Sequence, residues 1–331
     1  MLHLLPGNKM DRRDFITMAS AAALTGCASG KAWTLSAPAS YGKEGRASSR
    51  GARFHVFSKM FQPPVTKSPE ALCELFAAAG CDGVQWTVRK GGHATPGNAA
   101  TELPRLVKVA DSFGLKCESI CTDITADSIG RPGISPCAGD VLKAAADCGI
   151  RMFRPAYFFY DLKKETFRQS MDRIRGGFAK LARAAEKSGV KATYQNHSSW
   201  GPSVFGGLVW DVYECIRDLD PQHIGLEYDP MHAYFETNLS WSHGFELVAP
   251  WISSIDLKDF HYRPDPKNAK RTKKAMVAAG DGIVPWKEVA RLAAVNRVDP
   301  LYILHFEYDF DKTDLLKTVK TELSAFKSAL A

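Results

Sequence analysis

Four segments in the second half of the chain end in acidic, amide or imidazole side chains, and each follows a short β-rich run. They are Gln195-Asn196-His197, Glu227-Tyr228-Asp229, Asp256-Leu257-Lys258-Asp259 and His305-Phe306-Glu307. Residues two apart in a strand point to the same side, so each segment presents a pair of polar groups together. Burying so many polar groups is costly unless they are paired with one another or bound to a metal ion. The pattern therefore predicts a polar site that suits a divalent cation.

The elements that position these segments alternate between strand and helix patterns from residue 53 onward. The expected strands are 54–58, 83–88, 116–121, 151–155, 191–197, 224–229, 254–258 and 302–307. Apolar residues at helical spacing lie between them, as in 69–79 and 167–187. A glycine that tolerates the left-handed conformation precedes several strands, at Gly80, Gly114, Gly149 and Gly189.

Eight such units in about 280 residues indicate a single-domain (β/α)₈ TIM barrel over residues 53–331. A doubly wound sheet is the alternative fold, but no GxGxxG motif follows the first expected strand. In a barrel the carboxyl ends of the strands meet at one rim, where chemistry is usually found. We therefore expect the four polar segments to converge there.

The order of these motifs resembles the xylose isomerase-like TIM barrel superfamily, the sugar phosphate isomerase and epimerase family. That family typically has Glu-Asn-His, Asp-x-x-His, His-x-Lys-Asp and a final Glu at the ends of its last four strands. The corresponding segments here are Gln195-Asn196-His197, Asp229-Pro230-Met231-His232, Asp256-Leu257-Lys258-Asp259 and Glu307. Gly280-Asp281-Gly282 resembles the Gly-x-Gly turn before the family's seventh helix. The resemblance spans residues 53–331 and implies a metal-dependent sugar isomerase or epimerase.

The resemblance places the metal ligands at Gln195, Asp229, Asp256 and Glu307. Two of these positions depart from the family, because Gln195 replaces a glutamate and Asp256 replaces a histidine. Hard oxygen donors favour hard ions, so Mn²⁺ is expected first, with Mg²⁺ or Co²⁺ as alternatives. The competing interpretation is a decayed site, in which the polar strand ends form a salt-bridged rim with basic residues. Those basic residues would be Lys258 and Arg154.

The chemistry that the resemblance implies is proton abstraction next to a sugar carbonyl, through a metal-stabilised enediolate. An amide is not a base near neutral pH, so Glu307 and His197, rather than Gln195, are the expected catalytic groups. Lys258 would either neutralise a developing oxyanion or pair with a neighbouring aspartate. The expected substrate contacts are His232, Lys258, Arg154, Trp86 and Trp200.

Two other functions remain open from the sequence. One is a lyase that removes a proton beside a 3-oxo group and expels a glycosidic leaving group. The other is a non-catalytic carbohydrate-binding lipoprotein that has kept the fold and lost the metal site.

The first residues are typical of an export signal. Arg12-Arg13 precede a short apolar run, and Leu24-Thr25-Gly26-Cys27 resembles a lipobox whose cysteine is lipidated. We therefore expect a twin-arginine-type signal over 1–27, a flexible linker over 28–52, and a protein that is periplasmic or lipid-anchored at the cell envelope. Such a protein would touch the membrane only through its anchor, and its substrate would be an unphosphorylated sugar or glycoside.

The composition is that of an ordinary globular protein, with 45% hydrophobic and 24% charged residues. This excludes disordered and multi-span membrane classes. The eight cysteines form no CxxC pair and no zinc-ligand spacing. Much of the net charge of +7 lies in 267–274, with five basic residues in eight. We expect this segment to be a solvated loop and no nucleic acid to bind. The oligomeric state is open.

Overall fold

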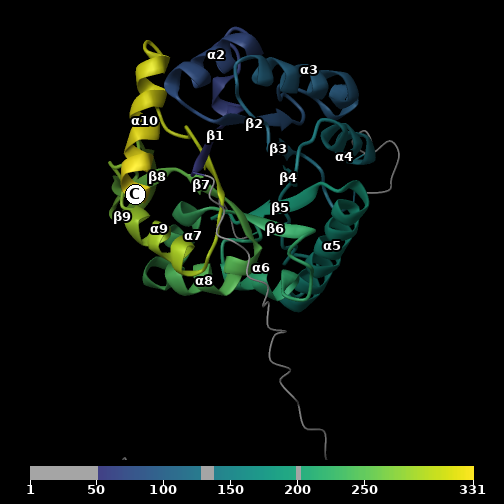
Figure 1. Cartoon of the computed structure of the whole chain (residues 1–331). Helices are drawn as coiled ribbons and strands as arrows, with labels where there is room; N and C mark the ends of the chain where they lie inside the picture. Colours follow the sequence, from purple (N-terminus) through teal and green to yellow (C-terminus); the bar gives the residue numbers. More distant parts are fainter. Residues whose placement is uncertain (1–50, 128–137, 199–202) are drawn as a thin grey trace, which may run out of the picture. The chain divides into compact units, whose positions relative to one another are not determined.

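The computed structural model describes residues 51–127, 138–198 and 203–331. These residues form a closed barrel of parallel strands in the order β1-β10-β7-β6-β5-β4-β3-β2. Helices surround the barrel between successive strands, as the ring in Figure 1 shows. The chain is therefore the (β/α)₈ TIM barrel that the sequence predicts. The predicted export signal, Cys27 included, lies outside the described residues, as does nearly all of the predicted linker.

All eight barrel strands are short. They are β1 Arg53–Phe57, β2 Gly83–Val88, β3 Ser119–Thr122, β4 Met152–Arg154, β5 Lys191–Gln195, β6 Ile224–Tyr228, β7 Ile252–Leu257 and β10 Leu301–Leu304. The surrounding helices are α2 Pro69–Ala79, α3 Ala99–Ser112, α4 Ala138–Asp147, α5 Phe167–Ser188, α6 Val209–Ile216, α7 Pro230–Thr237, α8 Trp241–Val248, α9 Trp286–Val295 and α10 Leu315–Leu330. Each predicted strand is confirmed, with ends that differ by a few residues. No helix in the described ranges is long and apolar enough to cross a membrane.

Local sequence signals fix the ends of the helices. The side chain of Ser68 caps the start of α2, and Thr166 forms a capping box with Gln169 at the start of α5. Both helices end on a glycine with positive φ, 84° at Gly80 and 73° at Gly189. Glycine adopts this conformation without the steric cost of a Cβ atom, which explains why the chain turns there toward the next strand.

Strand alternation separates an apolar layer from a polar interior. On β2, Val84 and Trp86 are fully buried in the main apolar core that the helices cover. Gln85 lies between them in sequence and hydrogen-bonds across the barrel interior to Glu227. Phe57, Cys121, Leu301 and Ile303 form a separate small apolar cluster. The strands thus carry apolar groups outward and a largely polar set inward, which creates the conditions for an active site.

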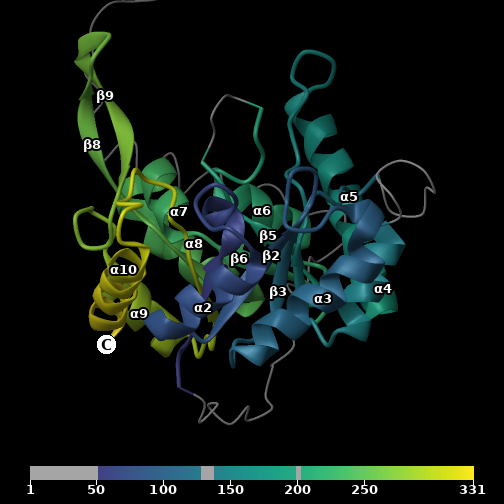
Figure 2. The ribbon, with the colours of Figure 1, turned by 90° about the horizontal axis from the view of Figure 1, so that it is seen from above.

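A hairpin interrupts the barrel repeat directly after β7. Its strands, β8 Asp259–Asp265 and β9 Asn268–Val277, pair antiparallel and project away from the barrel helices (Figure 2). The prediction of a solvated loop over 267–274 was therefore wrong, because most of that segment belongs to β9. Pairing with β8 satisfies the backbone of the segment, while side chains such as Arg271 and Lys273 stay exposed to water.

Asp259 holds the turn that leads from the hairpin to α9. Its carboxylate accepts hydrogen bonds from the backbone N–H groups of Gly280 at 3.3 Å and Val284 at 3.2 Å. The indole Nε1 of Trp286 donates to the same carboxylate at 3.3 Å. A Cβ atom on Gly282 would lie 1.9 Å from Asp259 Oδ1, so this position requires glycine. The Gly-x-Gly turn expected from the resemblance is thus built around one buried aspartate.

Candidate active site

The predicted polar segments meet at the carboxyl ends of β5, β6, β7 and β10, a region we call the mouth. Gln195 ends β5, Asp229 directly follows β6, and Asp256 is the penultimate residue of β7. The amide nitrogen of Gln195 donates to Asp256 Oδ2 at 2.5 Å and to Asp229 Oδ2 at 3.2 Å. Lys258 joins Glu307 to the same group. The four predicted ligands therefore belong to one connected network.

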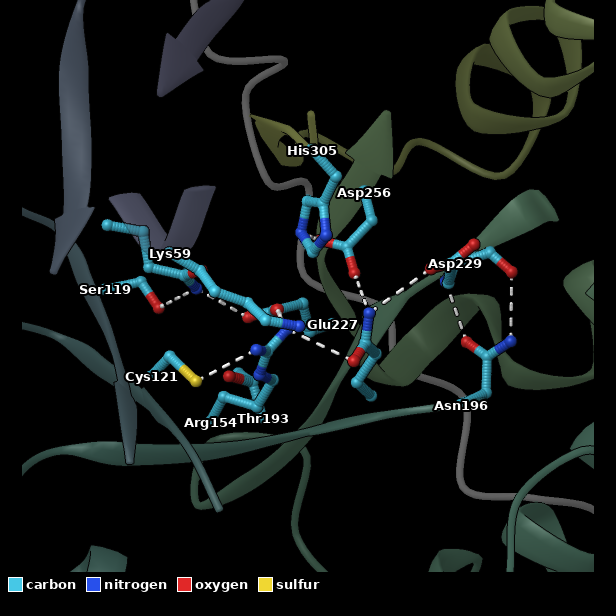
Figure 3. Close-up of polar contacts among 12 residues, drawn as sticks. Lys59, Ser119, Cys121, Arg154, Thr193, Asn196, Glu227, Asp229, Asp256 and His305 are labelled. Atoms are coloured by element: carbon cyan, nitrogen blue, oxygen red, sulfur yellow. Dashed lines mark hydrogen bonds and ion pairs between the residues drawn. The ribbon is translucent and has the colours of Figure 1, made fainter. Parts of the chain in front are cut away.

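Backbone and side-chain bonds from Asn196 and His232 fix Asp229 in place. Asn196 Oδ1 accepts from the backbone N–H of Asp229 at 2.7 Å, and Asn196 Nδ2 donates to its carbonyl at 3.0 Å (Figure 3). Asp229 Oδ1 accepts from the backbone N–H of His232 at 3.0 Å and so caps α7. Its other oxygen, Oδ2, is the one that faces the mouth.

Lys258 lies at the centre of the mouth and is only 2% exposed. Its Nζ atom is 2.8 Å from Asp229 Oδ2, 3.1 Å from Glu307 Oε2 and 2.9 Å from His232 Nε2. Burial opposes a charge on this amine, but Asp229, Glu307 and Asp256 outweigh it and raise the pKa of Lys258. The side chain is therefore an ammonium ion whose three N–H groups each have a partner.

Gln195 directs its amide nitrogen, and not its oxygen, toward the carboxylates. Its Oε1 accepts from Arg154 Nη1 at 3.1 Å and from the hydroxyl of Tyr157. A guanidinium can only donate and a carboxylate can only accept, so these partners fix the orientation of the amide. With N–H groups and an ammonium directed at the carboxylates, this arrangement does not fit a divalent ion held by all four predicted oxygens.

A second set of three side chains, which shares Asp256 with the predicted ligands, comes within metal-binding range beneath the mouth. Glu227, Asp256 and His305 each offer a ligand atom, and these atoms lie within 4.8 Å of one another. His305 Nε2 is 3.2 Å from Asp256 Oδ1 (Figure 3), yet that oxygen and both ring nitrogens of His305 have no hydrogen-bond partner in the described part of the chain. Carboxylate and imidazole groups are common metal ligands, and these unpartnered donor atoms fit a cation. The three residues form a possible metal site.

Glu227, one of these three residues, is held by a buried ion pair with Arg154. Arg154 Nη1 is 2.7 Å from Glu227 Oε1, and Gln85 donates to the other oxygen of Glu227 at 2.8 Å. Burial, followed by the negative charge of Asp256, raises the pKa of Glu227 to about 7, although Arg154 opposes the shift. Arg154 also donates to Cys121 Sγ at 2.9 Å. The structure thus places Arg154, a predicted substrate contact, among protein partners inside the barrel.

The sequence contained a signal for Glu227 and His305 that the ligand prediction did not use. Each lies two residues before a predicted ligand, Asp229 and Glu307 respectively, on the same side of its strand end. Alternation therefore predicts a polar set two layers deep. The resemblance led to Asp256 in the deeper layer but not to Glu227 or His305.

His197 and His232 stack on each other, with ring centroids 3.8 Å apart. Lys258 can only donate, so His232 Nε2 accepts and the proton lies on Nδ1, which donates to Ser198 Oγ at 2.7 Å. His197 Nδ1 donates to the carbonyl of Ser198 at 2.7 Å, which makes Nε2 its basic nitrogen. Burial, then the Lys258 charge, lowers the pKa of His197 to about 3. The same causes lower the pKa of His232, so both rings are neutral.

Glu307 is a partly accessible member of the predicted catalytic pair, since 24% of its side chain is exposed. Lys59 Nζ lies 3.3 Å from its Oε1, and Lys258 holds its Oε2. Burial alone would favour the neutral acid, but Lys258, His305 and Lys59 keep the pKa of Glu307 well below its usual range. The group is therefore an ionised carboxylate that water and a ligand can reach.

The aromatic predictions have different outcomes. Trp86 is fully buried beneath the helices and packs edge-on to His93, so the structure does not place it at the mouth. Trp200 lies outside the described residues. Tyr157 lines the mouth instead, with its hydroxyl on Gln195 and its ring 5.1 Å from that of His197.

The chain belongs to the xylose isomerase-like TIM barrel family, whose sequence pattern matches residues 73–327. No curated protein matches it in sequence.

Solved structures with the same fold include enzymes that act on sugars. D-psicose 3-epimerase from Clostridium cellulolyticum H10, studied with D-tagatose, is 11% identical, with a TM-score of 0.62 over 84% of this chain and 99% of that one. The 3-keto-D-glucoside 4-epimerase YcjR from E. coli is 11% identical, with a TM-score of 0.62 over 84% of this chain and 100% of that one. The probable 3-DHS dehydratase AsbF from Bacillus anthracis is 14% identical, with a TM-score of 0.57 over 81% of this chain and 98% of that one. At such identities the likeness shows the fold, which is that of sugar isomerases and epimerases.

Proposed function

We propose that this protein is an isomerase or epimerase that moves a proton next to the carbonyl of an unphosphorylated sugar or glycoside. The observation that carries the proposal is the pairing of Glu307 with Lys258 at 3.1 Å, on the accessible side of the mouth. An ionised carboxylate is a general base, and an adjacent cation stabilises the negative charge that forms on the carbonyl oxygen. The fold of sugar epimerases gives this pair a suitable scaffold.

Each group has a role in the proposed reaction. Glu307 removes the proton from the carbon beside the carbonyl. His197, a neutral imidazole stacked on His232, is the second proton-transfer group, because Gln195 cannot act as a base. His232 accepts a hydrogen bond from Lys258, which helps to position the ammonium group next to the substrate.

A divalent ion at Glu227, Asp256 and His305 would add Lewis-acid stabilisation to the same charge. Two carboxylates and one imidazole suit Mn²⁺, with Mg²⁺ or Co²⁺ as the alternatives. This ion remains a proposal that metal analysis of the purified protein tests. Its binding would compete with Arg154 and Gln85, which already occupy both oxygens of Glu227.

The unphosphorylated substrate follows from two considerations. The mouth cations Lys258 and Lys59 already contact carboxylates, so a phosphate would have to break those pairs. The proposed twin-arginine-type signal and the lipidation of Cys27 would place the protein in the periplasm or at the cell envelope, where phosphorylated sugars are scarce. Free ketoses and 3-keto-glycosides are therefore the substrate classes to test.

A lyase is the second candidate, favoured by the presence of Gln195 where a second carboxylate base would stand. A single base suffices to remove a proton beside a 3-oxo group and expel a glycosidic leaving group. One solved structure of the same fold is that of a probable 3-DHS dehydratase, and dehydration is an elimination, which is the reaction class of the proposed lyase.

The test is incubation of the full chain with D-psicose, D-tagatose and 3-keto-D-glucosides in deuterated water, followed by proton NMR. Isomerisation or epimerisation places deuterium on the carbon next to the carbonyl of the product. A free aglycone and an unsaturated sugar indicate the lyase instead. Sugar binding without turnover, unchanged in Glu307→Gln, would support the non-catalytic lipoprotein. Glu288→Gln, on the exposed face of α9, is the matched control.

A further inference from the structure

The mouth contains a cation that belongs to the chain itself. Lys258 Nζ contacts Asp229 at 2.8 Å and Glu307 at 3.1 Å, and both carboxylates belong to the metal-ligand set that the family resemblance predicts. We propose that the Lys258 ammonium occupies the position of the metal in this set, so that the mouth of this barrel works with a lysine in place of a divalent ion. A metal at Glu227, Asp256 and His305 would occupy a different position, which shares only Asp256 with this set.

The orientation of Gln195 is a second, independent observation. If an ion lay among these four side chains, the amide oxygen would have to face it, since an amide nitrogen is not a metal ligand. Instead the oxygen is bound by Arg154 and Tyr157, and the nitrogen donates to Asp229 and Asp256. Turning the amide toward a metal would break all four contacts and leave Arg154 facing the amide nitrogen.

The charges of the mouth support the same assignment. Asp229, Asp256 and Glu307 can carry three negative charges there. Lys258 neutralises the first and last of them by direct contact, and Lys59 adds a second positive charge 3.3 Å from Glu307 Oε1. The two lysines together carry the charge of one divalent ion. A metal entering this set would meet Lys258 at contact distance and would have to displace it.

This occupancy deepens the proposed function and rests on it for the catalytic step. When Glu307 removes the proton, the C–H electron pair forms the carbon–carbon double bond and the carbonyl electrons move to oxygen. Glu307 becomes a neutral acid and a weaker acceptor, so the N–H group of Lys258 that it held can turn to the new oxyanion. The positive charge stays in place while the negative charge moves from the carboxylate to the substrate.

The first experiment titrates the full chain with Mn²⁺ and follows free Mn²⁺ by electron paramagnetic resonance. We expect no Mn²⁺ to bind at the mouth of the wild type. Lys258→Met should gain one Mn²⁺ per chain, with an affinity roughly tenfold or more above any residual binding to the wild type, because a buried cation is removed from beside three carboxylates. Adding Glu307→Gln to Lys258→Met should abolish that gain. Lys273→Met, on the exposed face of the hairpin, should behave as the wild type.

The proposal is overturned if wild-type Mn²⁺ binding is lost in Glu307→Gln, or if Lys258→Met binds no better than the wild type. Wild-type binding that depends on His305 and not on Glu307 assigns the metal to the deeper site, and the proposal stands. If Lys258→Met does not fold, a wild-type crystal grown in excess Mn²⁺ decides. Anomalous density between Asp229 and Glu307 with Lys258 displaced would contradict the proposal, and Lys258 in place would support it.

The outcome is separate from that of the proposed function. Deuterium exchange without mouth-bound Mn²⁺ supports both proposals. Deuterium exchange that requires Mn²⁺ bound by Glu307 overturns the lysine assignment alone. A protein that binds sugar without exchange, and binds Mn²⁺ only after Lys258→Met, overturns the proposed function alone.

Discussion

Lys274, in the second strand of the hairpin, donates a 2.7 Å hydrogen bond to Ser198 Oγ just beyond the end of β5. Ser198 in turn accepts from His232, and His232 accepts from Lys258. The hairpin is therefore coupled to the centre of the mouth through three consecutive hydrogen bonds. Lys274 Nζ also lies 4.6 Å from the centre of the Phe235 ring, a cation–π contact that helps to hold this side chain in place.

Replacing Lys274 should weaken substrate binding more than catalysis. Lys274→Met removes the bond to Ser198 but keeps an apolar chain on Phe235, so the hairpin loses its link to the mouth. We expect KM to rise roughly tenfold, which corresponds to one hydrogen bond to a charged group, with a smaller change in kcat. Lys273→Met is the control, since that side chain is exposed. Equal KM values for the two variants would contradict the link.

Glu307 is expected to carry the proton transfer. Glu307→Gln removes the base while keeping size and hydrogen-bonding capacity, so kcat should fall by about 10²–10⁴-fold. Substrate binding, measured by calorimetry, should change much less, because the fold and the other mouth residues remain. A variant that keeps near-normal kcat would show that another group removes the proton.

The Arg154–Glu227 pair should be costly to break from one side. Arg154→Met leaves a buried, unpaired Glu227, and we expect the free energy of unfolding to drop by about 3–5 kcal/mol in urea titrations. Adding Glu227→Gln should recover part of this loss, because the second change removes the uncompensated charge. Lys143→Met breaks an exposed pair with Asp147, 2.7 Å apart, and should cost under about 1 kcal/mol. Similar losses in the two single variants would argue against a buried pair.

Glu322 gives the stability a specific pH dependence. Burial raises its pKa from 4.5 to about 7, although hydrogen bonds from Ala279 and Tyr308 oppose the shift. The folded protein therefore binds this proton more tightly than the unfolded chain. The resulting stabilisation is complete below about pH 4.5 and is lost as the pH rises through about 7, by at most about 1.4 kcal/mol per pH unit.

Glu322→Gln cannot titrate, so its free energy of unfolding should depend less on pH between 4.5 and 7 than that of the wild type. Urea titrations of both proteins at a series of pH values measure the difference. Curves that run parallel through this window would show that Glu322 keeps an ordinary pKa in the fold.

Gly282 is expected to tolerate no side chain. In Gly282→Ala the new Cβ would lie 1.9 Å from Asp259 Oδ1 and 2.7 Å from the backbone nitrogen of Phe260. The turn must shift, at a cost of about 1–3 kcal/mol in the free energy of unfolding. Gly139→Ala, in α4 with nothing within 4 Å, should be neutral or stabilising. Thermal denaturation of the two variants makes the comparison.

The barrel could be predicted from the sequence because its signals are local. Alternating strands, helical spacing and glycine ends such as Gly80 and Gly189 each depend on a few neighbouring residues. Strand alternation also explains why Trp86 is not a substrate contact. It is adjacent to Gln85 in one strand, so only one of the two can face the interior. The hairpin strand β9 was missed because its lysines and its arginine hide the strand pattern.

The partners of the site residues could not be predicted, because they come from distant parts of the chain. Arg154 and Glu227 are 73 residues apart, and Lys258 and Glu307 are 49 apart. Sequence reasoning identified both possibilities for Lys258, an aid to the oxyanion or an ion-pair partner. Which carboxylates it contacts, and which way the Gln195 amide turns, depends on the closed packing of all four strand ends.

The two ends of the hairpin are paired to each other, Asp259 with Val277, and Asp259 is also the residue that braces the turn before α9. The hairpin is thus an attachment with a fixed base. Its outer part can lengthen, shorten or change sequence without disturbing the barrel strands β7 and β10, which precede and follow it in the chain. Changes at the tip of this arm can therefore leave Lys258, which lies next to its root, in place.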